Sequence, residues 1–118
     1  MTTRYRMTAE QLLAQARIEL EQGDLLQASE KSWGAAAQMM KAVAEARGWQ
    51  HNKHALLFEV AARLAQEAGD DDIRRLFHAV GLLHTNFYEN WLDRDGVAGG
   101  VRDAEELMRR VEPLLALA

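Results

Sequence analysis

The stretch LLHTNFYENWL, residues 82–92, gathers more side chains capable of chemistry than any other part of the sequence. Its apolar residues recur at helical spacing, so its histidine, asparagine and tyrosine share a helix that must also build a core. An imidazole can move a proton or contact an anion near neutral pH. His84, Asn86 and Tyr88 are therefore candidate ligand-binding residues, with His84 and Tyr88 also candidates for catalysis. The alternative is that His84 is a structural side chain, at least half buried.

A second candidate region is the turn RGWQHNKH, which contains Arg47, Trp49 and His54. From Lys31 to Arg63 there are five basic and two acidic residues, although the whole chain has a net charge of −4. A local basic excess of this kind is typical of a solvated face or of an anion-binding patch. Trp49 stands beside basic residues, where it either closes the end of the fold or offers a stacking surface. We expect any ligand contact outside residues 82–92 to lie here.

Several kinds of chemistry lack the residues they need. The sequence has no cysteine, which excludes disulfides and thiolate zinc sites. The histidines of HNKH, residues 51–54, have no nearby carboxylate set to complete a metal site, and no glycine-rich phosphate loop is present. Ser29 and Ser32 lie on a helix without an acid–histidine relay. We therefore expect no metal and no cofactor, and binding rather than catalysis.

Composition points to a globular protein of the cytoplasm. The N-terminal sequence lacks the apolar run of a secretory signal, and no apolar stretch approaches the roughly 20 residues that cross a bilayer. A pI near 5.5 argues against the broad basic surface of a sequence-specific DNA-binding protein.

Helical spacing and stop signals predict the elements that position these residues. The capping-box pattern TAEQ predicts a first helix that opens at Thr8, leaving residues 1–7 flexible, and Gly23 ends it. A second helix spans residues 25–47 and stops at Gly48. A third follows the connection at residues 49–53 and stops at Gly69.

The segment GDDD predicts the start of a fourth helix, whose buried stripe includes His84, Phe87 and Trp91. Three glycines in residues 93–100 predict a flexible loop. A last helix begins near Val101, and Pro113 should kink or end it. Short connections favour antiparallel neighbours, so the sequence predicts one all-α domain over residues 1–118. Its architecture is an up-and-down antiparallel bundle of four main helices plus a shorter C-terminal fifth.

With these helices in place, the chain resembles a known family. The segment AQARIELEQGDLLQASEKSWGAAAQMMKAVAEARGWQHNKH, followed by LFHAVGLLHTNFYENWL, is similar to the small PaREP-type proteins of archaea and bacteria, in the HEPN-like group of helical bundles. The similarity covers roughly residues 9–115. It implies a helical bundle that forms a homodimer.

HEPN-like ribonucleases have a cleft lined by an arginine and a histidine, with four to six residues between them, and the histidine lies beside a tyrosine. The resemblance implies a similar cleft in this chain. The arginine holds a phosphate and the histidine moves a proton. His84 and Tyr88 fit this pattern, but His78 stands where the arginine is expected. The leading hypothesis is therefore a dimeric module that binds nucleotides or RNA-like anions near His84, Tyr88 and the turn from Arg47 to His54. One alternative is a metal-independent ribonuclease in which His78 replaces the arginine. Another is a scaffold for a protein partner.

Overall fold

The computed structural model describes residues 2–115 and contains five helices joined by short turns. Their bounds are α1 Thr2–Glu21, α2 Leu25–Arg47, α3 His54–Ala68, α4 Asp72–Glu89 and α5 Arg94–Leu115. Residues 2–115 include no strand. The predicted all-α bundle is confirmed. None of the five helices combines the length and the apolar character needed to cross a membrane.

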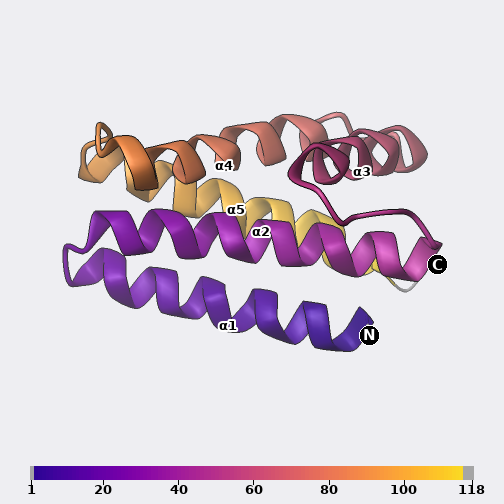
Figure 1. Ribbon diagram of the computed structural model, residues 1–118, viewed down its shortest axis with the longest axis horizontal. Coiled ribbons are helices and arrows are strands. Elements are labelled where there is room, and N and C mark those ends of the chain that lie inside the picture. Colours follow the sequence, from indigo (N-terminus) through magenta and orange to yellow (C-terminus); the bar gives the residue numbers. More distant parts are fainter. Residues whose placement is uncertain (1, 116–118) are drawn as a thin grey trace.

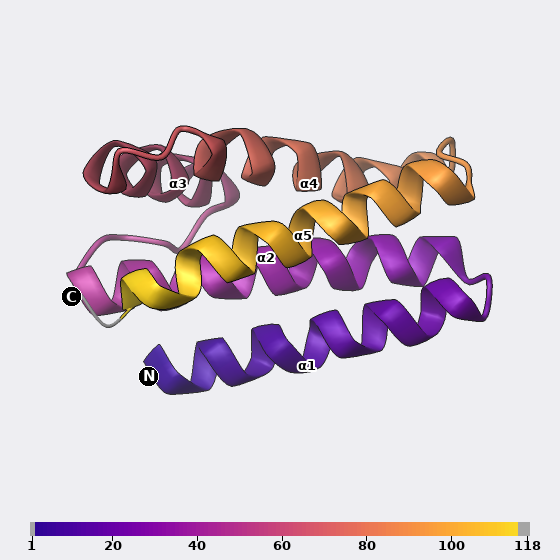
Figure 2. The same cartoon turned by 180° about the vertical axis from the view of Figure 1, so that it is seen from behind.

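Four of the helices lie along the long axis of the molecule, and α3 is placed differently. Figure 1 shows α1 and α4 running in one direction and α2 and α5 running in the other, and Figure 2 shows the same arrangement from behind. The short helix α3 lies at the end where α2 finishes and α4 begins. It is α2 that contacts all four other helices. The contact between α2 and α4 positions the candidate site.

The centre of α2 is slim because it is built largely from alanine and glycine. Ala35, Ala36 and Ala42 are fully buried, and such small side chains let neighbouring helices approach closely. Trp33 is the large exception. Its ring lies 5.3 Å from that of Phe77 on α4 and 6.1 Å from that of Phe58 on α3. This aromatic cluster fixes the three helices beside the candidate site.

The predicted stops of the middle helices are confirmed. Gly48 and Gly69 end α2 and α3 in the left-handed conformation, with φ of 72° and 66°, which glycine adopts without steric cost. At the other end of α2, the carboxylate of Asp24 accepts a hydrogen bond from the backbone N–H of Gln27 at 3.2 Å. This capping contact satisfies one of the free donors of the first turn.

The predicted start of the first helix was wrong. α1 begins at Thr2, so residues 2–7 are helical, while residue 1 lies outside the described residues. The hydroxyl of Thr8 donates to the carbonyl of Arg4 at 3.0 Å, a bond inside the helix and not a cap. The extension is stabilised by contacts with distant parts of the chain: Arg6 pairs with Glu112 at 3.0 Å, and Tyr5 packs edge-on against His51.

The predicted loop at residues 93–100 was also wrong, because α5 begins at Arg94. The side chain of Asp93 accepts from the backbone N–H of Gly96 at 2.8 Å and starts the helix. Gly100 is a packing position: a Cβ there would lie 2.5 Å from Leu83 of α4. With 22 residues, α5 is longer than the predicted short fifth helix, and α3 is the shortest with 15. Pro113 lies inside the last turns of α5.

One residue of the predicted buried stripe on α4 lies elsewhere. α4 ends at Glu89, and Asn90 follows with a φ of 52°. Trp91 therefore lies beyond the helix and is 52% exposed. The prediction assumed that helical spacing continues to Trp91, but the left-handed conformation of Asn90 ends the helix before it.

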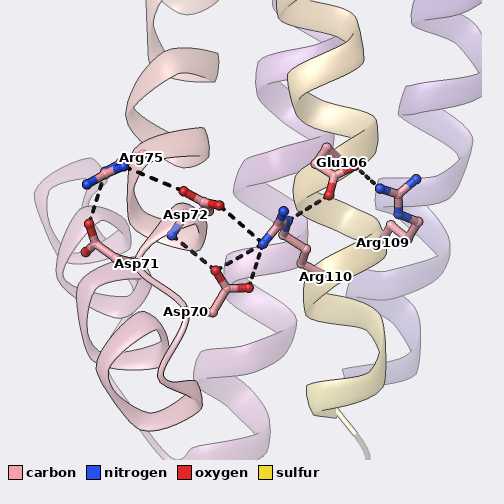
Figure 3. A network of polar contacts seen from close by, with 7 residues as sticks. All are labelled: Asp70, Asp71, Asp72, Arg75, Glu106, Arg109 and Arg110. Carbon is pink, nitrogen blue, oxygen red and sulfur yellow. Dashed lines mark hydrogen bonds and ion pairs between the residues drawn. The ribbon is translucent and has the colours of Figure 1, made fainter.

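A network of charged side chains ties the start of α4 to α5 (Figure 3). Arg110 of α5 contacts both carboxylate oxygens of Asp70, at 3.0 and 2.9 Å, and Asp72 at 3.5 Å. Its Nε atom also donates to Glu106 at 2.7 Å. These hydrogen bonds raise the pKa of Arg110, and those from Arg110 and Arg109 lower the pKa of Glu106.

Candidate functional site

His84 lies at the meeting point of α2, α3 and α4. Its Nδ1 atom is 2.9 Å from a carboxylate oxygen of Glu30, and its ring stacks on Trp33 with centroids 5.2 Å apart. The ring of His54 meets it edge-on at 5.3 Å. An ionised carboxylate only accepts hydrogen bonds, so Nδ1 is the donor in this pair. The side chain of His84 is 28% exposed, which agrees with the expected burial of at least half.

His84 lines one end of a long groove across the bundle. The groove has two adjoining hollows of about 420 and 390 Å³. Lys41 and His54 line both hollows, so the two lie side by side. The first hollow is also lined by Glu30, Lys31, Trp33, Gln38 and His84. The second is lined by Tyr5, His51, Asn52, Lys53 and Leu57.

The charge of this groove is opposite to that of the whole chain. All three lysines of the sequence, Lys31, Lys41 and Lys53, line it, and so do three of the four histidines. Lys31 pairs with the buried Glu19, whereas Lys41 and Lys53 form no ion pair with a carboxylate of residues 2–115. Glu30 is the one acid among the described lining residues. The groove therefore offers positive charge and hydrogen-bond donors to an anion.

The histidines do not form a metal centre in the part of the chain that the structure describes. Over residues 2–115 no three histidine or carboxylate side chains are grouped to hold a metal ion. His51 is engaged separately, since its Nε2 atom lies 3.2 Å from Glu45. The arrangement suits anion binding or proton transfer by imidazoles.

Two of the predicted ligand residues, Arg47 and Trp49, lie away from the groove. Arg47 donates to Glu67 of α3 at 2.9 Å and to the carbonyl of Leu114 of α5 at 3.1 Å, and its side chain is 7% exposed. Trp49 lies beneath the guanidinium of Arg63, 4.1 Å from the ring centroid. Both side chains hold the ends of α2, α3 and α5 together.

Asn86, another predicted ligand residue, is fully buried and shapes the turn after α4. Its side-chain oxygen accepts from the backbone N–H groups of Trp91 and Leu92, both at 2.8 Å. Its amide nitrogen donates to the hydroxyl of Ser29 on α2 at 3.0 Å. All of these bonds are internal, which accounts for the burial of a polar side chain.

The remaining candidates flank the groove to different degrees. Tyr88 is 71% exposed and meets His84 edge-on at 5.4 Å. It stands at the margin of the groove. His78 is exposed, packs edge-on against Phe58 at 4.9 Å, and does not line either hollow. The structure thus brings His54 and His84 together and leaves His78 outside.

The candidate site residues selected from the sequence did not include Glu30 and Lys41. Both lie on the face of α2 that also carries Trp33, since residues 30, 33, 37 and 41 follow the three-and-four spacing of a helix. This spacing was visible in the sequence. The contact of that face with the His84 face of α4 depends on the packing of the helices, which the spacing does not give.

Comparisons with known proteins agree with this fold. None of the curated proteins compared with the chain matches it. A crystal structure of a protein from Sulfolobus solfataricus has a TM-score of 0.81 to it and 24% sequence identity, over 90% of this chain and 94% of that chain. That likeness shows the fold. Residues 4–108 match the Archaeal PaREP1/PaREP8 family. This match covers most of the sequence, and the chain belongs to the Archaeal PaREP1/PaREP8 family.

Proposed function

We propose that the protein is a dimeric binding module for nucleotides or RNA-like anions, and that the anion lies in the groove between α2, α3 and α4. One observation carries this proposal: a chain with a net charge of −4 gathers all of its lysines and three of its four histidines on one groove. Lys31, His51 and His84 each contact a carboxylate. Lys41 and Lys53 form no ion pair within residues 2–115, and such positive side chains attract phosphate groups. The HEPN-like resemblance in the sequence supports the same ligand class.

The shape of the groove supports an extended ligand. Its two hollows adjoin at Lys41 and His54, and each hollow has its own lysine, Lys31 or Lys53. A ligand with two or more negative groups can contact both ends, whereas a single phosphate contacts one. Tyr5 and Trp33 border the two hollows and supply apolar ring surface beside the charges.

Titration with a mononucleotide and with short single-stranded RNA at low salt tests the proposal. Binding should be tighter for RNA, and it should weaken as salt is raised, with a slope of about −0.7 per phosphate contact. Absence of binding for both ligands at low salt contradicts the proposal.

A second candidate function is metal-independent cleavage of RNA, favoured by the two imidazoles that meet at 5.3 Å. His84, held by Glu30, would take the proton of a ribose 2′-hydroxyl as its oxygen attacks the phosphorus. His54 would return a proton to the leaving 5′-oxygen, and Lys41 would neutralise the phosphate. Lys41 thus takes the role that the sequence suggested for His78.

The paired variants His84→Ala and His78→Ala test this second function. Cleavage should be lost in the first variant and kept in the second. Equal, negligible cleavage by both variants and by the natural protein ends this candidate and leaves the binding proposal in place.

A further inference from the structure

The outer face of α4 carries a stripe of exposed residues at coiled-coil spacing. Its members are Arg75, His78, Leu82, Thr85 and Glu89, separated by three, four, three and four residues. All five are exposed. This spacing places the five side chains on one side of α4, with Leu82 as the one apolar residue at their centre. One end of this face touches α3, where His78 packs edge-on against Phe58, and the five side chains remain exposed.

Exposed apolar side chains gather around the same half of α4. Leu82 is 51% exposed at the centre of the stripe, and Tyr88 and Trp91 are 71% and 52% exposed near its end. Of these three, Leu82 lies on the stripe, Tyr88 lies on the side toward His84, and Trp91 follows the end of the helix. Met7 and Ile18, the other two large apolar side chains exposed in the described chain, lie on α1.

The charges of the stripe are arranged symmetrically about Leu82. Arg75 lies seven residues before it and Glu89 seven residues after it. If a second α4 lies antiparallel with Leu82 facing Leu82, Arg75 of each copy faces Glu89 of the other. The guanidinium of Arg75 also contacts Asp71, just before α4, at 3.1 Å and Asp72 of α4 at 3.8 Å, but its side chain is 69% exposed and accessible to a partner.

We propose that the outer face of α4 is the surface through which two copies of this chain pair, antiparallel and two-fold symmetric about Leu82. The contact is isologous, as a two-fold axis requires, and it spans about 21 Å at 1.5 Å per residue. Leu82 supplies the apolar centre and two Arg75–Glu89 pairs set the direction and register. Tyr88 lies between this stripe and His84, so pairing places the second copy beside the margin of the groove.

This inference deepens the dimeric part of the proposed function, and charge exchange between the two positions tests it. In the Arg75→Glu variant, the new glutamate of each copy faces Glu89 of the other, so like charges meet at both ends of the contact. The Glu89→Arg variant likewise places two arginines opposite each other at both ends. Each single variant should dimerise about tenfold more weakly. Mixing the two variants should restore a heterodimer, because both pairs are then opposite in charge, and the double variant should pair with itself. Sedimentation velocity over a concentration series measures these outcomes.

Two controls separate the surface from general effects of charge and folding. Arg74→Glu makes the same charge change one residue away from the stripe and should leave dimerisation unchanged. Leu82→Lys should weaken it about a hundredfold, since it affects the centre of the contact twice, whereas Ile18→Lys on α1 should not. Circular dichroism confirms that each variant keeps its helices.

The inference is overturned if the natural protein is monomeric, or if it pairs but Leu82→Lys and the charge exchange leave the dimer unaffected. Titration of the same samples with RNA measures binding in the groove independently of dimerisation. A protein that binds RNA without pairing through α4 contradicts this inference alone, and one that pairs through α4 without binding RNA contradicts the anion-binding proposal alone.

Discussion

The carboxylate of Glu30 on α2 lies 2.9 Å from Nδ1 of His84 on α4, and it is the one acid among the described lining residues of an otherwise basic groove. This pair fixes which nitrogen of the imidazole carries a proton and joins the two helices at the site. It also brings a negative charge to a surface that we propose binds anions.

Glu30→Gln should strengthen RNA binding about threefold. The amide oxygen still accepts from His84, while the negative charge, which opposes a phosphate several ångströms away, is removed. Competition titration at low salt measures the change. Glu105→Gln on α5 removes the same charge outside the groove and serves as the control. Unchanged or weaker binding by Glu30→Gln would show that the carboxylate does not face the bound anion.

Substitution by alanine at two neighbouring glycines of α5 should change the stability of the fold in opposite directions. A Cβ at position 100 would lie 2.5 Å from the buried Leu83, whereas one at position 99 meets only the end of Arg102 at 3.8 Å. Gly100→Ala should destabilise the fold by about 1–3 kcal/mol through overpacking. Gly99→Ala should stabilise it by about 0.5–1 kcal/mol, because alanine favours a helix. Urea unfolding measures both, and equal effects would refute the close approach of α4 and α5.

Arg110→Ala should lower the thermal midpoint more than Arg109→Ala. Arg110 joins Asp70, Asp72 and Glu106 from two parts of the chain, whereas Arg109 contacts Glu106 of its own helix (Figure 3). Calorimetry at neutral pH compares the two variants. Equal midpoints would mean that the contacts with Asp70 and Asp72 add nothing to stability.

The same charged network should make the stability of the fold depend on pH in the acidic range. The pKa of Glu106 is lowered by hydrogen bonds from Arg110 and Arg109. A carboxyl whose pKa is lower in the folded state stabilises the fold above its unfolded pKa, and this contribution is lost as pH falls through the folded value. Arg110→Ala removes one of the two arginines that lower the pKa of Glu106, so the difference in stability between this variant and the natural protein should shrink as pH falls below the ordinary value of 4.5. A difference that persists in acid would argue against these ion pairs.

Asp103 should behave in the opposite way. Burial raises its pKa, and Arg102 offsets this only in part. Its ionised form is thus disfavoured in the fold, and its contribution to stability falls as pH rises through the folded pKa. Asp103→Asn should stabilise the protein at neutral pH by up to about 0.5 kcal/mol and should have no such effect in acid. Chemical unfolding at both pH values measures this, and a loss of stability at neutral pH would contradict it.

The sequence predicted the fold where signals were local. Gly48 and Gly69 end their helices as expected, because a left-handed cap depends on the residue itself. Residues 2–7 and 94–100 were misassigned because their helices depend on distant contacts. Arg6 reaches Glu112, and Gly100 rests on Leu83. Glycine propensity alone favours a loop, and packing overrides it.

For the candidate site too, residue types could be predicted from the sequence, whereas contacts between helices could not. His54 and His84 were named from their residue types, and the structure places them in contact. Arg47 was named for its charge, but Glu67 and Leu114 engage it at the end of the bundle. Which helix faces meet depends on crossing angles and side-chain volumes, and these are properties of the assembled core.

The most direct test of the central claim is RNA binding by the double variant Lys41→Gln/Lys53→Gln, measured at low salt beside Arg102→Gln/Arg109→Gln. Each double variant removes two positive charges, the first pair from the groove and the second from the exposed surface of α5. We expect the lysine variant to lose affinity about tenfold or more and the arginine variant to change little. Equal affinities in the two variants would contradict the central claim.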